Sequence, residues 1–330
     1  MFFSKEIGID LGTSSILAYT KEKLVLNEPS VVAVNKKSEE LVAVGKEARK
    51  MLGRTPENIT AIRPLKDGVI SNYTLTEKML KYYIKQINKF NLISPKVMIC
   101  IPSEITEVEK KAVIDAAEYA GIRKVYLIEE PIAAAIGAGV DISKPKGNMV
   151  IDIGGGTTDI AVISMYGKVV SRSIKIAGDA FDEYISRFLK RKYNIIIGEK
   201  TAENLKKTIG CVYPKEINEE KEIGGRDVVT GLPKNIIVTS REIYAALRVP
   251  IYQIIDIIKS VLEETPPELI ADIAKNGIYL SGGGSLISGF DKLISESIGI
   301  DVYMTENPES CVVKGTYMAL VNRDKYIKNI

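Results

Sequence analysis

The sequence predicts an α/β protein built from two similar α/β domains, each with a smaller inserted subdomain, around a nucleotide cleft. Strand-like apolar runs alternate with helical patterns along the chain. Residues 6–19 and 150–163 share one pattern, in which an apolar run leads through an aspartate to a glycine-containing turn and a second apolar run. The 330 residues are enough for two sizeable hydrophobic cores.

Composition excludes several classes of function. Basic and acidic residues are interspersed and the net charge is +3, so we predict no nucleic-acid-binding face. The absence of histidine excludes Ser-His and Cys-His catalysis and His-ligated zinc. Cys100, Cys211 and Cys311 form no CxxC pattern, so we expect a reducing compartment and core or neutral positions for them. No apolar run could span a membrane, and we expect no signal peptide at this N-terminus.

The second copy of the repeated pattern, residues 150–163, is typical of a phosphate-binding turn. Three glycines, Gly154 to Gly156, allow the backbone to approach an anion closely and to point N–H groups at it. Thr157 and Thr158 can add hydroxyl donors. Asp152 lies where a carboxylate could hold Mg²⁺ through water. Taken alone, the stretch is equally compatible with an ordinary glycine-rich hairpin.

The first copy, residues 6–19, places Asp10 before a turn that contains Gly12, Thr13 and Ser14. It lies 142 positions before its counterpart, which suggests two halves of one design. Two facing turns of this kind could grip a polyphosphate from both sides, and the pair is far more specific than either turn alone.

The segment between the first copy and residue 95 contains two strands, a small polar insertion and a helix. Residues 24–26 and 31–34 are strand-like, and residues 35–65 are polar and glycine-bearing. Residues 63–68 form a turn back to the main domain. Apolar residues at helical spacing then predict a helix over 75–90, which residues 91–95 break.

Residues 97–137 continue the alternation of strands and helices. A buried strand over 97–102 precedes a helix that begins with a capping box, Thr106 and Glu109. Gly121 is placed to end that helix in the left-handed region. A strand over 125–128 leads into Glu129 and Glu130, and a small-residue helix follows that can pack closely.

The second half is predicted to contain a second insertion and a third glycine turn. A helix begins at Gly178, and residues 201–207 are predicted as an exposed helix. Residues 212–240 suit the strands and turns of an insertion. One helix starts at Ser240 and another at residues 265–268, where proline is tolerated in the first turn. Residues 278–285 form a strand followed by a glycine turn.

Two common nucleotide motifs are absent from this third turn. Walker A requires a lysine after the second glycine, and Phe290 stands there instead. The dinucleotide fingerprint requires a third glycine where Ile287 stands. A nucleotide site in this chain therefore belongs to neither class.

Two further features have competing interpretations. Glu129 and Glu130 are adjacent, so they are unsuited to act as a couple; one could orient a water, or both could favour a helix N-terminus. Leu92 and Ile93 lie at an exposed break, which either folds back onto the core or forms a hydrophobic tip that touches a membrane or partner.

The aspartate turns, the Glu-Pro pair and the third glycine turn together resemble the actin-like ATPase superfamily, which includes actin, the large heat-shock chaperones and many sugar kinases. Within it the chain is similar to the MreB family of bacterial actins, including MreB- and Mbl-type paralogues. The similarity covers essentially the whole chain and is clearest at residues 27–31, 61–64, 67–70, 128–137 and 265–269.

The resemblance implies ATP and Mg²⁺ as cofactors. Asp10 and Asp152 would organise Mg²⁺ through water, and Glu130 would position the attacking water with help from Thr157. Phosphoryl transfer needs positioning and charge neutralisation more than covalent chemistry, which fits these residue types. The nucleotide would be held by Gly12, Thr13, Ser14, Gly154, Gly155, Gly156 and Thr157 at the phosphates, and by Glu203, Lys206, Gly282, Gly283 and Gly284 at the nucleoside.

The resemblance also implies a cytoskeletal function. ATP would close the cleft, and closed subunits would form filaments, as paired protofilaments, on the inner face of the cytoplasmic membrane. The filaments would organise cell-wall synthesis and cell shape, with RodZ, MreC and MreD as partners. Leu92 and Ile93 match the membrane-insertion loop, although Ile93 replaces a frequent aromatic, and Phe2 and Phe3 are further candidates for this contact.

In the family's pattern the chain divides into four subdomains. These are IA (residues 1–32, 66–141 and 318–330), IB (33–65), IIA (142–180 and 242–317) and IIB (181–241). The alternative from an enzyme class is a small-molecule kinase of the same fold, which would need a general-base acid facing an acceptor pocket. The alternative from a binding class is a chaperone ATPase domain, which is disfavoured because we expect no substrate domain after residue 330.

Overall fold

The computed structural model describes residues 5–21, 23–89, 93–213 and 218–326, and its first half is built on a five-stranded sheet. The strand order is β10-β9-β1-β2-β3. Strands β1, β2 and β3 are antiparallel neighbours, whereas β9 and β10 run parallel to β1. The bounds are β1 Glu6–Leu11, β2 Ser15–Thr20, β3 Lys23–Pro29, β9 Lys96–Ile101 and β10 Lys124–Glu129.

The second half repeats this sheet strand for strand. Its order is β13-β12-β11-β17-β18, again with an antiparallel meander on one side of the first strand and two parallel strands on the other. The bounds are β11 Asn148–Ile153, β12 Thr158–Ser164, β13 Gly167–Ile174, β17 Ile278–Ser281 and β18 Val302–Met304. Both copies of the repeated pattern are therefore the first hairpin of a sheet, which confirms the prediction of two similar halves.

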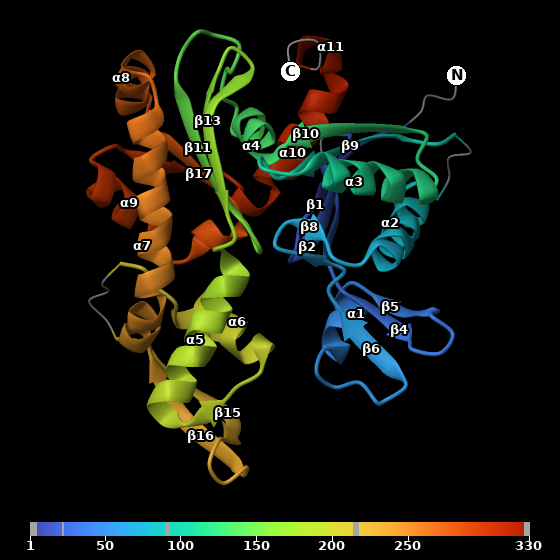
Figure 1. Ribbon diagram of the computed structural model, residues 1–330, viewed down its shortest axis with the longest axis vertical. Coiled ribbons are helices and arrows are strands. Elements are labelled where there is room, and N and C mark those ends of the chain that lie inside the picture. Colours follow the sequence, from blue (N-terminus) through green and yellow to red (C-terminus); the bar gives the residue numbers. More distant parts are fainter. Residues whose placement is uncertain (1–4, 22, 90–92, 214–217, 327–330) are drawn as a thin grey trace.

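Each half also carries a small three-stranded sheet. The sheet of the first half, β5-β4-β6, lies below the main sheet in Figure 1, and that of the second half, β14-β15-β16, lies at the lower left. The elements are β4 Val32–Asn35, β5 Leu41–Val44, α1 Lys46–Met51, β6 Ile59–Ile62, β14 Ile195–Ile196, β15 Glu220–Asp227 and β16 Pro233–Thr239. A short hairpin, β7 Leu65–Lys66 and β8 Val69–Ile70, follows the first of these sheets.

Two of the helices begin with a capping box. Thr106 and Glu109 form the predicted capping box, and Thr239 and Glu242 form a second one before the long α7. Gly121 follows its helix with φ +97°, as predicted. The bounds are α2 Tyr73–Ile87, α3 Glu107–Tyr119, α4 Glu130–Gly137, α5 Gly178–Tyr193, α6 Glu199–Ile209, α7 Ser240–Glu264, α8 Pro267–Asn276, the 3₁₀ turn η1 Gly283–Leu286, α9 Phe290–Ile298, α10 Pro308–Val321 and α11 Arg323–Tyr326.

Helices α4 and α10 pack together between the two large sheets (Figure 1). The prediction that the small-residue helix packs closely is confirmed by two glycines at the crossing. A Cβ atom on Gly137 would lie under 3.0 Å from the carbonyl oxygen of Cys311, and one on Gly315 would lie equally close to that of Ala133. The helix that begins at Glu130 is therefore fixed against the element that joins the two halves.

Each main sheet has its own buried core. One cluster centres on β1 and β9 and includes Ile7, Ile9 and Ile99; the other centres on β11 and α7 and includes Ile151 and Phe181. The predicted exposed helix over 201–207 is wrong in part, because α6 is amphipathic and buries Leu205 and Lys206. Its alternating charges suggested solvent, but one face packs against the second core.

Candidate functional site

The two aspartate turns face each other across the gap between the sheets. A Cβ atom on Gly155 would lie under 3.0 Å from the Ser14 side chain, and one on Gly156 would meet Thr13 equally closely. Only glycine fits such an approach without displacing the opposite turn. The two turns, 142 positions apart in sequence, therefore form one surface of backbone and hydroxyl groups.

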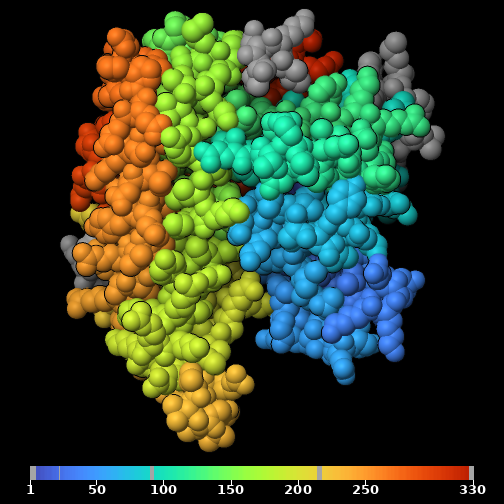
Figure 2. All heavy atoms as spheres, viewed as in Figure 1, coloured from blue at the N-terminus to red at the C-terminus, as the bar shows by residue number. Residues whose placement is uncertain are grey.

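A cavity of about 1030 Å³ opens between the halves, and every residue predicted for catalysis, nucleotide or Mg²⁺ lines it. Figure 2 shows the lower lobes of the two halves separated by a groove. The fifteen residues are Asp10, Gly12, Thr13, Ser14, Glu130, Asp152, Gly154, Gly155, Gly156, Thr157, Glu203, Lys206, Gly282, Gly283 and Gly284. The fold thus brings together residues from both halves that are far apart in sequence.

Buried carboxyl groups crowd the floor of this cavity. Burial raises the pKa of Asp10 to about 6, against a hydrogen bond from the Cys100 thiol that acts to lower it. Burial likewise raises the pKa of Asp152 to about 7, although Ser281 donates a hydrogen bond to it. The pKa of Glu130 is raised well above its ordinary value by burial and by the nearby carboxylates of Asp159, Asp10 and Asp152. Negative charge at this place is therefore poorly compensated by the chain itself.

This donor set fits Mg²⁺ held through water. Asp10 and Asp152 are the last acids of equivalent strands, β1 and β11, and both face the cavity. They offer carboxylate oxygens, the ligand type that Mg²⁺ prefers, and a divalent cation between them would offset the crowded negative charge. Bound there, Mg²⁺ would supply charge neutralisation for phosphate oxygens.

The two adjacent glutamates face different surroundings, as their spacing predicts. Glu129 ends β10 and forms an ion pair with Lys168 of β13. Glu130 is the first residue of α4 and lines the cavity near Asp10. Of these two glutamates, only Glu130 lines the cavity.

Lys206 is held by hydrogen bonds on the far side of the cavity. Its ammonium group donates to the carboxylate of Asp182 at 2.9 Å and to the Gly178 carbonyl oxygen at 2.6 Å, and the side chain is nearly buried. Asp182 lies on α5, one turn after the Gly178 that begins this helix. The sequence identified the helix start but gave no signal that Asp182 would partner Lys206.

Ion pairs join the two lobes across the mouth of the cavity. Arg49 of α1 pairs with Glu203 of α6. Arg63 lies 3.3 Å from Asp179 and also pairs with Glu199, so it reaches both α5 and α6. These arginines were not singled out from the sequence, because their partners are more than 100 positions away.

The third glycine turn closes one side of the cavity. Gly282 has φ +85°, and a Cβ atom there would lie under 3.0 Å from the Ile153 carbonyl. Glycine is required both for the left-handed backbone and for this approach to β11. The turn after β17 therefore lies directly beside the turn after β11.

The residues predicted for membrane contact are described only in part. Ile93 is exposed, with 41% of its surface accessible. Leu92, Phe2 and Phe3 lie outside the described residues. Lys5 nevertheless lies next to both ends of the 88–95 segment, because its ammonium donates to the Ile87 carbonyl and its own carbonyl accepts from the Lys96 N–H. In the described part of the chain, none of the helices is both long and apolar enough to cross a bilayer.

Comparison with known proteins identifies the family of this chain. The family model described as "MreB/Mbl protein" matches residues 4–328. The chain belongs to the MreB/Mbl family. The cell shape-determining protein Mbl of Bacillus subtilis is 53% identical over 99% of this chain and 98% of its own length. The cell shape-determining protein MreB of Escherichia coli K12 is 48% identical over 96% of this chain and 94% of its own length.

Solved structures confirm the actin-like fold class of this MreB/Mbl member. Crystal structures of MreB5 of Spiroplasma citri bound to AMPPNP and to ADP match with TM-scores of 0.93 and 0.94 at 40% identity. The match to the AMPPNP-bound structure covers 99% of this chain and 98% of the MreB5 chain, and the match to the ADP-bound structure covers 100% of both chains. A MamK double helical filament has the same fold, with a TM-score of 0.82 at 22% identity over 96% of this chain and 98% of its own.

Asp152→Asn is expected to stabilise the nucleotide-free protein increasingly as the pH rises. Burial raises the pKa of Asp152 from 3.8 to about 7, so protonation of Asp152 stabilises the folded state. This contribution is complete below about pH 4, declines as the pH rises and is lost once the pH has risen through 7. Asparagine has no proton to lose and can still accept the hydrogen bond from Ser281. The stability advantage of the variant should grow by about 1–3 kcal/mol between pH 5 and pH 8.

Urea unfolding at both pH values, without nucleotide or Mg²⁺, measures this difference. The matched control is Asp141→Asn, because hydrogen bonds from Ser143 and Lys144 lower the pKa of Asp141 to about 2. That group is ionised throughout the range, so its effect should not change between pH 5 and pH 8. An advantage of Asp152→Asn that is independent of pH would show that the carboxylate is compensated in the folded protein.

Proposed function

We propose that this protein binds and hydrolyses ATP and polymerises into filaments that organise cell-wall synthesis and so govern cell shape. The observation that carries the proposal is the pair of equivalent aspartate turns that face each other in one cavity. Relatives of the same family are cell shape-determining proteins, and two of the similar structures hold AMPPNP and ADP. A small-molecule kinase is less favoured, since the similarity extends over the full length of the MreB/Mbl relatives.

The proposed arrangement of Mg²⁺ and ATP follows the cavity from floor to mouth. Residues 12–14 and 154–157 hold the phosphates through backbone N–H and hydroxyl groups. Asp10 and Asp152 hold Mg²⁺ through water beneath them. The nucleoside lies between Gly282 to Gly284 on one side and Glu203 with Lys206 on the other. Glu130, assisted by Thr157, positions the attacking water, and the chemistry then requires only in-line attack and charge neutralisation.

Cleft closure is proposed to depend on the ion pairs at the mouth. Arg49 and Arg63 belong to the segment of the first half that carries the small sheet, and their partners lie on α5 and α6 of the second half. The proposed subdomains IB (33–65) and IIB (181–241) are the segments that carry these small sheets, apart from Val32 at the start of β4. The proposed subdomains IA (1–32, 66–141 and 318–330) and IIA (142–180 and 242–317) comprise the rest of the chain. ATP would contact both halves of the cavity and hold the lobes, which these ion pairs already join, in the closed arrangement that assembles.

A sedimentation assay tests this function. The full chain with Mg²⁺ and ATP is expected to pellet as filaments, and adding liposomes should increase the pelleted fraction. Hydrolysis is followed in the same samples by phosphate release. Protein that stays in the supernatant with ATP, with and without lipid, would contradict the filament proposal. Phosphate transfer to a small-molecule acceptor in preference to water would favour the kinase instead.

Filaments are proposed to attach to the inner face of the cytoplasmic membrane through Leu92 and Ile93, with Phe2 and Phe3 beside them. A large apolar side chain contributes about 1.5–3 kcal/mol when fully buried, so partial insertion of two would hold a monomer weakly. A filament presents many copies at once, and multivalency makes the attachment stable.

Nearby, Lys5, Lys21 and Lys23 line a second cavity, whose positive charge suits anionic headgroups. RodZ, MreC and MreD remain the proposed protein partners, by family resemblance.

The double substitution Leu92→Glu with Ile93→Glu is expected to release filaments from liposomes while ATP-dependent pelleting without lipid persists. Two carboxylates in place of two apolar side chains should lower the lipid-bound fraction by at least about tenfold, because 1.4 kcal/mol corresponds to that factor. Val42→Glu is the control, since Val42 is an apolar residue on β5 that is exposed to an extent similar to Ile93. If liposomes still increase the pelleted fraction of the double variant as they do for the wild type, the loop is not the anchor and Phe2 with Phe3 is tested next.

A further inference from the structure

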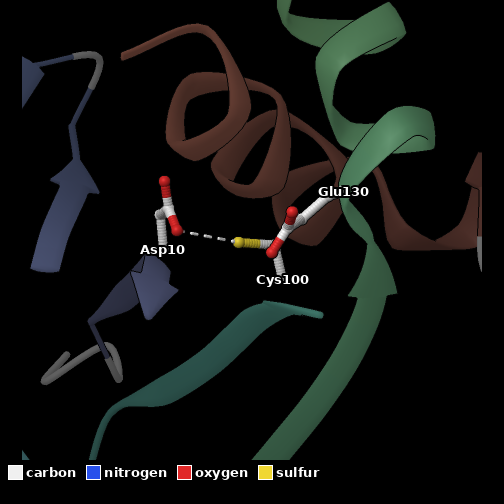
Figure 3. Close-up of side chains that lie close together, drawn as sticks. All are labelled: Asp10, Cys100 and Glu130. Atoms are coloured by element: carbon white, nitrogen blue, oxygen red, sulfur yellow. Dashed lines mark hydrogen bonds between the residues drawn. The ribbon is translucent and has the colours of Figure 1, made fainter. Parts of the chain in front are cut away.

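A buried cysteine thiol lies beside two carboxylates that line the cavity. Figure 3 shows the side chains of Asp10, Cys100 and Glu130 converging from β1, β9 and α4. Each offers one ligand atom, and these atoms all lie within 4.8 Å of one another. The Cys100 Sγ atom is 3.4 Å from Asp10 Oδ1 and donates a hydrogen bond to it. Strand pairing fixes this contact, because Asp10 and Cys100 are register partners in parallel strands.

The mixture of sulfur and oxygen ligands is unlike a Mg²⁺ site. Mg²⁺ takes oxygen ligands almost exclusively, whereas thiolate ligands favour zinc-group cations. Zinc–sulfur and zinc–oxygen bonds of about 2.3 and 2.0–2.2 Å in a tetrahedron place the two ligand atoms about 3.5 Å apart. The 3.4 Å between Sγ and Oδ1 already has this spacing.

We propose that Asp10, Cys100 and Glu130 form a binding site for a thiophilic divalent cation, Zn²⁺ or Cd²⁺, with the fourth position open to the cavity. Cys100 is 3% exposed, whereas Asp10 and Glu130 line the cavity, so the ion enters from the nucleotide side. On binding, the Sγ–H bond breaks and a metal–sulfur bond forms with no change of oxidation state. The thiol proton, and the proton that the raised pKa leaves on Glu130, pass to solvent. This site differs from the proposed Mg²⁺ position, which uses Asp10 with Asp152, but the shared Asp10 makes the two cations compete.

The site would make the protein sensitive to inhibition by soft metals. A cation bound to Glu130 occupies the carboxylate that is proposed to position the attacking water, so this carboxylate is no longer available for hydrolysis. This consequence rests on the proposed ATPase function, whereas binding of the metal rests only on the three side chains. The two therefore need separate measurements.

Metal binding is tested with CoCl₂ added to the full chain without nucleotide or Mg²⁺. Thiolate bound to Co²⁺ gives a charge-transfer absorption in the near ultraviolet. The band is expected in the wild type, in Cys211→Ser and in Cys311→Ser, to be lost in Cys100→Ser, and to be displaced by CdCl₂. Glu130→Gln keeps the thiol and should weaken Co²⁺ binding by at least about tenfold, because loss of even an outer-shell partner has that effect.

Two results would overturn the site: no band in the wild type, or a band that survives Cys100→Ser. Circular dichroism verifies that each variant is folded. If Cys100→Ser is not folded, the effect of Glu130→Gln on the Co²⁺ titration decides.

Inhibition is tested by titrating CdCl₂ into the Mg²⁺-ATPase reaction, with each rate expressed relative to the uninhibited rate of the same variant. Cys100→Ser should require at least about tenfold more Cd²⁺ than the wild type or Cys311→Ser. Equal sensitivity would refute the inhibitory role, and a Co²⁺ band without any ATPase activity would refute the proposed function but not the site.

Discussion

Glu130→Ala is expected to lower the rate of ATP hydrolysis by about 10²–10⁴-fold while ATP still binds, since a positioned acid or base contributes a factor of that size. Glu130 begins α4 and faces the cavity beside Asp10 and the phosphate turns. The proposed phosphate and nucleoside contacts come from other residues, so they are unchanged in the variant. Phosphate release measures hydrolysis, and binding of a fluorescent ATP analogue measures affinity.

Glu129→Ala is the matched control for this experiment. The same side chain is removed one position earlier, but Glu129 points to Lys168 and forms an ion pair there. Loss of a partly exposed ion pair costs about 0–1 kcal/mol, so hydrolysis should stay within about fivefold of the wild type. Unchanged turnover in Glu130→Ala would refute its role, and an equal loss in both variants would indicate general damage to the β10–α4 junction.

The site could be predicted from sequence where a local pattern determines local geometry. Residues 6–19 and 150–163 each contain an apolar run, an aspartate and a tight turn, and both form the first hairpin of a five-stranded sheet. Because the two runs are similar, they take equivalent places in equivalent sheets. Their aspartates then reach the same cavity from opposite sides. The repeat therefore carried information about tertiary structure that a single motif lacks.

Contacts between distant segments could not be predicted in the same way. Cys100 reads as one apolar residue in a buried strand, and only the parallel register with β1 places it opposite Asp10. Arg49 and Glu203 each lie on helices with many charged residues, and nothing local marks them as a pair. Long-range pairing depends on how the two lobes are oriented, which periodicity and composition do not encode.

The burial of Lys206 could not be predicted from sequence either. Its helix is rich in lysine and glutamate, which is typical of a solvated surface. In the structure its ammonium is enclosed by Asp182 and the Gly178 carbonyl, so the charge is paired and hydrogen-bonded rather than hydrated. A buried charge is tolerated only with such partners, and both lie on a different helix.

Gly315→Ala is expected to destabilise the protein by about 1–3 kcal/mol, although helix propensity alone predicts the opposite sign. Within a helix, alanine is favoured over glycine by about 1 kcal/mol. Gly315 lies inside α10, however, where a Cβ atom would come under 3.0 Å from the Ala133 carbonyl oxygen of α4. That oxygen is backbone and cannot rotate away, so the helices must separate, and overpacking of this kind typically costs 1–3 kcal/mol or more.

Gly198→Ala is the control for this experiment, because it adds the same methyl group where no atom lies close. Gly198 precedes α6 with φ −79°, and a Cβ atom there meets nothing within 4 Å. The same added methyl group should therefore change the free energy of unfolding by only about 1 kcal/mol or less. Urea unfolding followed by circular dichroism compares the two variants. A Gly315→Ala protein as stable as the wild type would mean that α4 and α10 can move apart freely. Since α4 begins at Glu130, such freedom would also leave the proposed catalytic carboxylate without a fixed position, so the tight crossing and efficient hydrolysis should be lost together.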